Sequence, residues 1–547
     1  MSKKELKLLL NLLLIAMCAS LFLLSSCAIK VAPTGGEKDV TPPKVLKSVP
    51  ENYSTSFNQK EIVISFDEYV QLKETDKQII ISPIIKPAPE ISVKNKNIEI
   101  KFSESLQKNT TYTINFGNAI TDVHEGNTYE GYQFVFSTGA SLDSSSIKGK
   151  VHFANNLKTE KGILVMLYTN STDSVPYKTI PDYFAKTDDA GNFSIKNIRN
   201  ASYKIFALKE SDGNYLFNSS DELIAFNDGL SNANDTNTAE LSLFKEEDSK
   251  FFIKTKGFAE KGKFVLVFNK PLGNIELKNL SAENIPVEQK EFSIQKDSLI
   301  LWMKDTMVNN LNFTLWNNEQ LIDTVVFTEK KTTNKPTGRD SDVGFKLRAS
   351  INTEGLIKTN DTLVITFSAP LVLSKSNPEK IQLTKDSITS IPFTTEWIDS
   401  SNRKLKIIFK PIEQEVYKLF IPPKNFTSIF GLSNDSLVFN ITTLESTKLG
   451  SVLVKLSGIN EGNYLLQLVN DKDETIYQRK ITGAGKYLFE LIDPLKYKLR
   501  LVYDSNSNGK WDTGNYLKKI QPEKIIYFTS EINIRANWDI EQEWNLK

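Results

Sequence analysis

Apolar and polar residues alternate in short runs along most of this chain. Residues 97–102 and 111–116, for example, carry an apolar side chain at every second position. Such alternation predicts half-buried β-strands, because successive side chains of a strand point to opposite faces of a sheet. Gly, Pro and Asn residues separate the runs and mark turns. The pattern therefore predicts an all-β fold of tandem β-sandwiches, stacked into an elongated arm.

One succession of strands occurs three times, with a first, a second and a closing strand in each copy. The first strands are 62–66, 264–268 and 363–367, the second are 98–102, 299–302 and 405–409, and the closing ones are 134–137, 325–328 and 437–440. Internal repeats indicate repeated structural units. We expect three related sandwiches at 43–140, 250–328 and 343–445, of which the copy at 250–328 is degenerate.

A second succession of strands occurs twice. Its strands are 147–151, 163–168, 187–195 and 202–208, and again 451–456, 464–469, 483–489 and 497–502. We expect two further sandwiches at 145–245 and 448–547. Residues 329–342 are rich in Lys, Thr, Pro and Asp, which predicts a linker between the third and fourth units.

The repeated units resemble two known kinds of module. The relevant segments of the first unit are 42–45, 48–50, 66–68, 117–122 and 136–138. They are similar to the opening and the close of the bacterial Ig-like domain first recognised in surface-layer proteins. The strands of 145–245 and 448–547 resemble the transthyretin-like sandwich of carboxypeptidase regulatory and collagen-adhesin B-type domains. That second resemblance implies scaffolding modules rather than enzymes.

The N-terminal residues have the three parts of a secretory signal peptide. Three lysines give a positive start, residues 8–24 are almost all apolar, and Ser25 and Ser26 directly precede Cys27. We therefore predict a signal peptide at 1–26. The segment before Cys27 resembles a lipobox, which implies that Cys27 receives a diacylglycerol and becomes the new N-terminus. The alternative is an uncleaved membrane anchor.

Residues 27–42 contain several Pro and Gly residues and are predicted to be a lipidated tether. Together with 33–39, the whole chain resembles a group of Ig-like-domain lipoproteins of Bacteroidota. Surface-exposed lipoproteins of that phylum carry acidic residues after the cysteine, whereas 28–31 here contain none. We therefore expect a lipid anchor in the outer membrane, on the periplasmic face rather than the cell surface.

Composition narrows the classes of function. Lys plus Arg number 67 and Asp plus Glu 66, so the net charge of +1 argues against a nucleic-acid binder. Both cysteines lie within the first 27 residues, so the mature chain is expected to have no disulfide. The two histidines, His124 and His152, leave little room for imidazole chemistry. The chain also lacks the common nucleophile, phosphate-binding and zinc motifs, and we expect no enzyme.

One loop has the spacing of a calcium site. Oxygen donors at Asp504, Asn506, Asn508 and Asp512, with the carbonyl of Lys510, match alternate positions of a calcium loop, and Gly509 permits its sharp turn. Asn515 stands where a bidentate Glu is expected, although Glu523 follows on the next strand. The alternative is an Asx-rich turn between strands, since Asn, Asp and Gly dominate turns.

Asp followed by Ser or Thr and then an apolar residue recurs at 297–299, 323–325, 361–363, 386–388 and 435–437. The pattern resembles the O-glycosylation sequon of Bacteroidota secreted proteins. The alternative is a turn that ends where a strand begins.

These observations favour a non-catalytic, membrane-anchored lipoprotein of the cell envelope with a structural or protein-interaction role. An accessory subunit of an outer-membrane complex would fit, with an envelope or outer-membrane protein as its partner. The alternative is an adhesive or glycan-binding surface lipoprotein. Its only hint is the three aromatic residues Trp511, Trp538 and Trp544, for which packing in a core is the competing interpretation.

Overall fold

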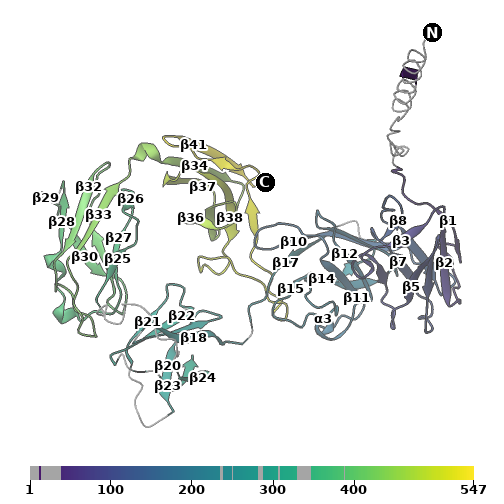
Figure 1. Cartoon of the computed structure of the whole chain (residues 1–547), viewed down its shortest axis with the longest axis horizontal. Coiled ribbons are helices and arrows are strands. Elements are labelled where there is room, and N and C mark those ends of the chain that lie inside the picture. Colours follow the sequence, from purple (N-terminus) through teal and green to yellow (C-terminus); the bar gives the residue numbers. More distant parts are fainter. Residues whose placement is uncertain are drawn as a thin grey trace, which may run out of the picture.

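The computed structural model describes residues 12–13, 39–234, 238–248, 250–260, 262–280, 287–305, 308, 310–328, 346–386 and 388–546. The predicted signal peptide, Cys27, most of the tether and the predicted linker at 329–342 lie outside the described residues, apart from 12–13. Elsewhere the chain forms tandem β-sandwiches, which confirms the predicted all-β fold (Figure 1). In the parts of the chain that are described, no helix has the length and apolar character needed to cross a membrane.

The first sandwich packs two sheets, in the orders β1-β2-β6-β5 and β4-β7-β9, with β3 paired to β8. Alternate residues of β2 are buried, as its apolar periodicity requires, and they meet the second sheet in one core. The elements are β1 (Val45–Val49), β2 (Glu61–Phe66), β3 (Val70–Leu72), α2 (Thr75–Gln78), β4 (Ile80–Ser82), β5 (Glu90–Lys94), β6 (Asn97–Lys101), β7 (Thr111–Asn115), β8 (Ile120–Asp122) and β9 (Gln133–Ser137).

The third and fourth sandwiches repeat the first sheet of the first one. Its order recurs as β18-β19-β22-β21 and as β25-β27-β31-β30. The first and second strands of each predicted repeat are the two inner strands of each sheet. The elements are β18 (Ile253–Glu260), β19 (Lys263–Phe268), β20 (Ile275–Asn279), β21 (Val287–Phe292), β22 (Ser298–Met303), β23 (Asn310–Asn317) and β24 (Gln320–Thr328), then β25 (Ala349–Ile351), β26 (Leu356–Ile357), β27 (Leu363–Phe367), η1 (Leu373–Lys375), η2 (Pro378–Lys380), β28 (Gln382–Lys385), β29 (Thr389–Ser390), β30 (Thr394–Trp397), β31 (Lys404–Ile408), β32 (Val416–Ile421) and β33 (Leu437–Thr443).

The second and fifth sandwiches share one topology. The sheets β13-β10-β17 and β12-β11-β14-β15 recur as β37-β34-β41 and β36-β35-β38-β39, and the first strand of each sandwich pairs in parallel with its last. The elements are β10 (Ser145–Phe153), β11 (Leu164–Tyr168), α3 (Val175–Lys178), β12 (Tyr183–Lys186), β13 (Asn192–Ile198), β14 (Ser202–Lys209), β15 (Leu223–Phe226), β16 (Ser231–Asn232) and β17 (Ala239–Leu243), then η3 (Ser446–Lys448), β34 (Gly450–Ser457), β35 (Tyr464–Val469), β36 (Thr475–Ile481), β37 (Gly485–Ile492), β38 (Lys496–Tyr503), β39 (Ile525–Tyr527), β40 (Ile532–Asn533) and β41 (Asp539–Asn545).

The central strands of the second sandwich are apolar on both faces. Every residue of β11 is buried, because Val165 and Leu167 face the interior of the sandwich while Leu164, Met166 and Tyr168 belong to a separate outer cluster. A sheet that is apolar on both faces needs a cover on each. The outer cover includes residues of other sandwiches, and it determines how the chain is arranged.

The expectation of an extended arm is wrong. After the second sandwich the chain passes through the third and fourth, and the fifth returns to lie beside the second, so that these four form a ring with the first sandwich outside it (Figure 1). The loop between β38 and β39 makes the closing contacts. The periodicity of apolar residues predicts the strands within each sandwich. It does not predict that the fifth sandwich packs beside the second.

Candidate functional site

The loop at 504–523 contains all the predicted calcium ligands. Asp504 is buried, and its Oδ1 and Oδ2 accept hydrogen bonds from the backbone N–H groups of Asn508 and Gly509, each at 2.9 Å. Gly509 has φ of 83°, which confirms the sharp turn expected there. Glu523 accepts from the backbone N–H of Ser505 at 2.7 Å and that of Asp512 at 3.1 Å. These two carboxylates therefore fix the shape of the loop.

Asp512 is already surrounded by donors. Its Oδ2 accepts from the amide groups of Asn506 and Asn508, and the Lys510 ammonium lies 3.2 Å from its Oδ1. Partial burial opposes the charge, but these donors hold the pKa of the Asp512 carboxyl below its ordinary value. Within the described residues, no three acidic, His or Cys side chains gather closely enough to hold a metal ion. The geometry favours the turn, and calcium binding stays a prediction.

The second half of the loop, residues 513–521, docks on the second sandwich, and we call it the clasp. Thr513 Oγ1 donates to the carbonyl of Lys245 at 2.6 Å, and the backbone N–H of Tyr516 donates to Glu246 at 2.5 Å. Gln521 donates to the carbonyl of Phe226 at 3.0 Å. The clasp thus binds both the outer sheet of the second sandwich and the segment that leaves it.

Tyr516 is the apolar centre of this contact. It is 1% exposed and lies among Tyr168, Tyr177, Phe206, Phe226 and Phe244, a group that we call the seat. Its ring meets Phe206 at 5.1 Å and Phe226 at 5.0 Å, both edge to face, an arrangement that aromatic pairs favour. Burial raises the pKa of Tyr516 well above its ordinary value, and its hydroxyl donates to Asp173 at 3.3 Å.

The clasp approaches the seat closely. A Cβ atom at Gly514 would lie 2.7 Å from the ring of Phe244, which is too near for any side chain. Glycine therefore allows the backbone of the clasp to lie directly on the aromatic ring.

Two groups of ion pairs also join the second and fifth sandwiches. Asp173 accepts from Lys204 at 2.5 Å and from Lys519 of the clasp at 2.6 Å, and these lysines hold the pKa of its carboxyl well below the ordinary value. In the fifth sandwich, Asp473 binds Lys158 of the second at 2.6 Å and Lys498 of its own at 3.3 Å. Both acidic groups thus bridge lysines from the two sandwiches.

A buried ion pair joins the third and fourth sandwiches. The Arg403 guanidinium donates to both oxygens of Glu291, at 2.8 and 2.6 Å, and to the carbonyl of Phe367 at 2.9 Å. Trp302 donates its indole N–H to Glu291 at 3.0 Å, and the guanidinium lies over its ring. Trp302 is 1% exposed and packs in the core cluster of the fourth sandwich, although it belongs to β22 of the third.

Lys358 joins the fourth and fifth sandwiches. Its ammonium donates to the hydroxyl of Tyr477 at 3.0 Å, the carbonyl of Leu491 at 2.9 Å and the carboxylate of Asp493 at 2.9 Å. Burial opposes its charge, yet these partners raise the pKa of Lys358 above its ordinary value. A charged side chain thus binds the neighbouring sandwich at three junctions of the ring, namely second to fifth, third to fourth and fourth to fifth.

The sequence alone did not single out Tyr516, Lys519, Arg403 or Lys358. Tyr516 has a weak local signal, since it is an apolar residue in a loop that is otherwise mostly polar. Trp302 has no clear signal, because β22 is apolar at every position from 299 to 303 and only the burial pattern of the structure sets Trp302 apart.

The turn after β8 is built on Asp122. Its carboxylate is buried and accepts from the backbone N–H groups of Glu125, Gly126 and Asn127 at 2.6, 3.0 and 2.6 Å. Burial opposes the charge, but these donors lower the pKa of Asp122. His124 is exposed in this turn. His152 lies on β10, 3.1 Å from the hydroxyl of Ser242, and burial lowers its pKa. His124 therefore belongs to an exposed turn, and His152 is a partly buried residue of a strand.

The three C-terminal tryptophans have different environments. Trp544 is buried in the core of the fifth sandwich, and half-buried Trp511 donates to the carbonyl of Glu523 at 2.8 Å. Trp538 is 53% exposed and lines a groove of about 670 Å³ on the β37-β34-β41 sheet. Of these three tryptophans, Trp538 is therefore the most exposed, and the Arg535 guanidinium lies 4.9 Å from its ring centroid.

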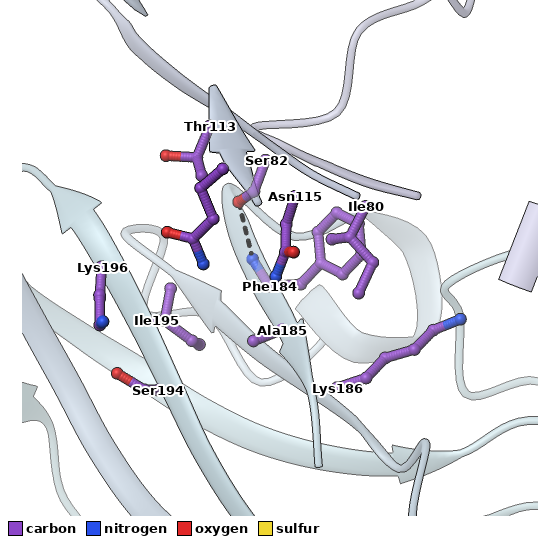
Figure 2. Close-up of a pocket in the computed structure, with 11 residues that line it drawn as sticks. Ile80, Ser82, Thr113, Asn115, Phe184, Ala185, Lys186, Ser194, Ile195 and Lys196 are labelled. Carbon is purple, nitrogen blue, oxygen red and sulfur yellow. Dashed lines mark hydrogen bonds between the residues drawn. The ribbon is translucent and has the colours of Figure 1, made fainter. Parts of the chain in front are cut away.

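A small crevice lies between the first and second sandwiches (Figure 2). Strands β4 and β12 meet there, and the backbone N–H of Phe184 donates to Ser82 Oγ at 3.1 Å. Polar groups from both sandwiches, among them Asn115 and Lys196, surround a space of about 100 Å³. Ligand pockets are usually several times larger, so this crevice is better described as a seam between two sandwiches.

The proposed glycosylation segments include several strand starts. Ser298, Leu363 and Leu437 are the first residues of β22, β27 and β33, as the turn interpretation requires. Glycosylation stays a prediction.

Comparison with known proteins supports the Ig-like fold of the first sandwich. Residues 39–138 match the family model of a bacterial Ig-like domain. A search of curated proteins gives no match.

Several solved structures match this chain at low sequence identity. The surface-layer protein SbsC is 12% identical over 90% of this chain and 68% of its own, with a TM-score of 0.14. The TIE protein of Bacillus anthracis is 9% identical over 94% and 76%, with a TM-score of 0.14. The major pilin subunit BcpA of Bacillus cereus is 9% identical over 74% and 99%, also with a TM-score of 0.14. These values support no conclusion about function.

Proposed function

We propose that this chain is a non-catalytic scaffold of the cell envelope, held on the outer membrane by lipid on Cys27, which binds an envelope or outer-membrane protein. One observation carries the proposal. The charged side chains of Arg403, Lys358 and Lys519 join neighbouring sandwiches. Fixing the sandwiches in this way suits a body that positions a partner.

The lipid anchor is tested by substitution of the cysteine. Cys27→Ser removes the thiol that accepts the lipid, and we expect the chain to lose incorporation of a fatty-acid analogue and to remain unprocessed. Cys18→Ser is the matched control and keeps both labelling and processing. Equal labelling of the Cys27→Ser chain would contradict the proposed anchor.

The partner is tested by crosslinking in intact cells followed by affinity purification. A scaffold subunit brings down one envelope protein in fixed ratio, and the expected periplasmic position protects the chain from protease added to whole cells. Digestion of intact cells would place it on the surface instead. Purification without a stoichiometric partner would contradict the scaffold role.

A second candidate function is glycan binding, favoured by the exposed Trp538 beside its groove. Aromatic rings and polar rims are the usual lining of small-ligand sites. A glycan array would then show binding that Trp538→Ala abolishes and that Trp316→Ala, in the third sandwich, leaves unchanged. Identical array signals for the wild type and Trp538→Ala would exclude this groove.

A further inference from the structure

The seat is an apolar surface that the second sandwich covers only in part. Its own α3 and Phe217 cover one side, and Ile80 and Ile84 of the first sandwich contact the same cluster. The remaining cover comes from the fifth sandwich, as Tyr516 of the clasp and Trp511 shortly before it. Without the clasp, the rings of Phe206 and Phe226 would lose this partner and face water, which costs free energy.

The clasp makes its main contacts with one sandwich, the second. Tyr516 fills the aromatic group, Lys519 binds Asp173, and Gln521 donates to Phe226 and to Asp228 at 2.9 Å. All of these partners belong to the second sandwich. A clasp from any copy of this chain would therefore make the same contacts with the same seat.

We propose that the clasp is exchangeable, so that the seat of one molecule binds residues 513–521 either of its own chain or of a second copy. Two opened rings then close on each other in a reciprocal dimer. Exchange of identical elements needs no new contact, which makes it a low-cost route to assembly. Within one chain the two parts are tethered, and this raises the effective concentration that favours the closed monomer. The inference requires neither the lipid anchor nor the proposed envelope partner.

The ion pair between Lys519 and Asp173 provides a test that leaves the cores intact. The side chains of Lys519 and Asp173 are 44% and 53% exposed, so their substitution leaves the buried cores unchanged, although Asp173 also binds Lys204 and the Tyr516 hydroxyl. In an Asp173→Lys chain, the lysine introduced beside the seat repels Lys519 of the same chain. In a Lys519→Asp chain, the aspartate introduced into the clasp repels Asp173 of the same chain. When the two variants are mixed, both exchanged contacts pair opposite charges. The seat of the Asp173→Lys chain binds the clasp of the Lys519→Asp chain, and the seat of the Lys519→Asp chain binds the clasp of the Asp173→Lys chain.

The experiment uses the full-length chain in detergent, with the molar mass of the protein measured by light scattering after size exclusion. We expect each variant alone to be a monomer and the equimolar mixture to form a heterodimer of twice that mass. The chain with both substitutions restores the pair internally and serves as the monomeric control. A mixture that stays monomeric would overturn the proposal, as would dimers of the doubly substituted chain in the same amount.

Discussion

Tyr516 packs edge-on against Phe206, with ring centroids 5.1 Å apart and planes at 89°, although the two residues belong to the fifth and the second sandwich. This contact converts a series of sandwiches into a ring. Two groups of ion pairs, on Asp173 and on Asp473, also join these sandwiches.

Removal of the Tyr516 ring should open the ring of sandwiches. Truncation of a buried aromatic side chain costs about 3–5 kcal/mol, and a loss of ~3 kcal/mol corresponds to roughly a hundredfold shift in an equilibrium. Hydrogen exchange of the β15 amides, beneath the clasp, should accelerate by that factor in Tyr516→Ala. Leu517→Ala is the control, because Leu517 is 63% exposed. Equal acceleration in both variants would show that Tyr516 is not the centre of the contact.

Loss of one partner of the buried pair at the third–fourth junction should be costly. Arg403→Met leaves Glu291 charged and buried, and such a change typically costs about 3–5 kcal/mol. The double variant Arg403→Met with Glu291→Leu removes the stranded charge, so we expect it to be more stable than the single one. Urea unfolding of the three proteins measures the difference. A double variant less stable than Arg403→Met would contradict the argument.

Asp122 should make the first sandwich sensitive to acid. Its pKa is lowered in the folded chain, so its contribution is complete above the unfolded pKa of about 3.9 and disappears as the pH falls through the lower folded value. Asp122→Asn should therefore be less stable than the wild type at neutral pH, with a gap that narrows below about pH 4. Unfolding measured from pH 7 to pH 2 tests this. A constant gap would show that the charge is not what the turn uses.

The loop at 504–512 should hold its shape through hydrogen bonds rather than through calcium. Asp504→Ala removes the acceptor of the Asn508 and Gly509 amides, and we expect the same fall in melting temperature with calcium and with chelator. Ser507→Ala, with an exposed side chain in the same loop, is the control. A wild-type melting temperature that rises with calcium, and a rise that Asp504→Ala abolishes, would instead establish the predicted metal site.

The strands were predictable because their signal is local. In β6, Ile98 and Ile100 alternate with polar neighbours, and the structure buries both. The relative positions of the sandwiches could not be predicted in this way. The alternation of apolar and polar residues in a strand is the same whichever sandwich lies beside its own. Tyr516 and Phe206 come together only when the two intervening sandwiches set the return path. The predicted calcium loop shows the same limit, since spacing alone does not reveal that Lys510 neutralises Asp512.

Ring closure is tested most directly by crosslinking. Lys204 and Lys519 both bind Oδ1 of Asp173, at 2.5 and 2.6 Å, so their amino groups are neighbours although they lie in different sandwiches. In the isolated monomer, a short amine-reactive crosslinker should join Lys204 to Lys519 in the wild type, with a strong decrease in Tyr516→Ala. A monomer in which both lysines react but are never joined would contradict the closed ring.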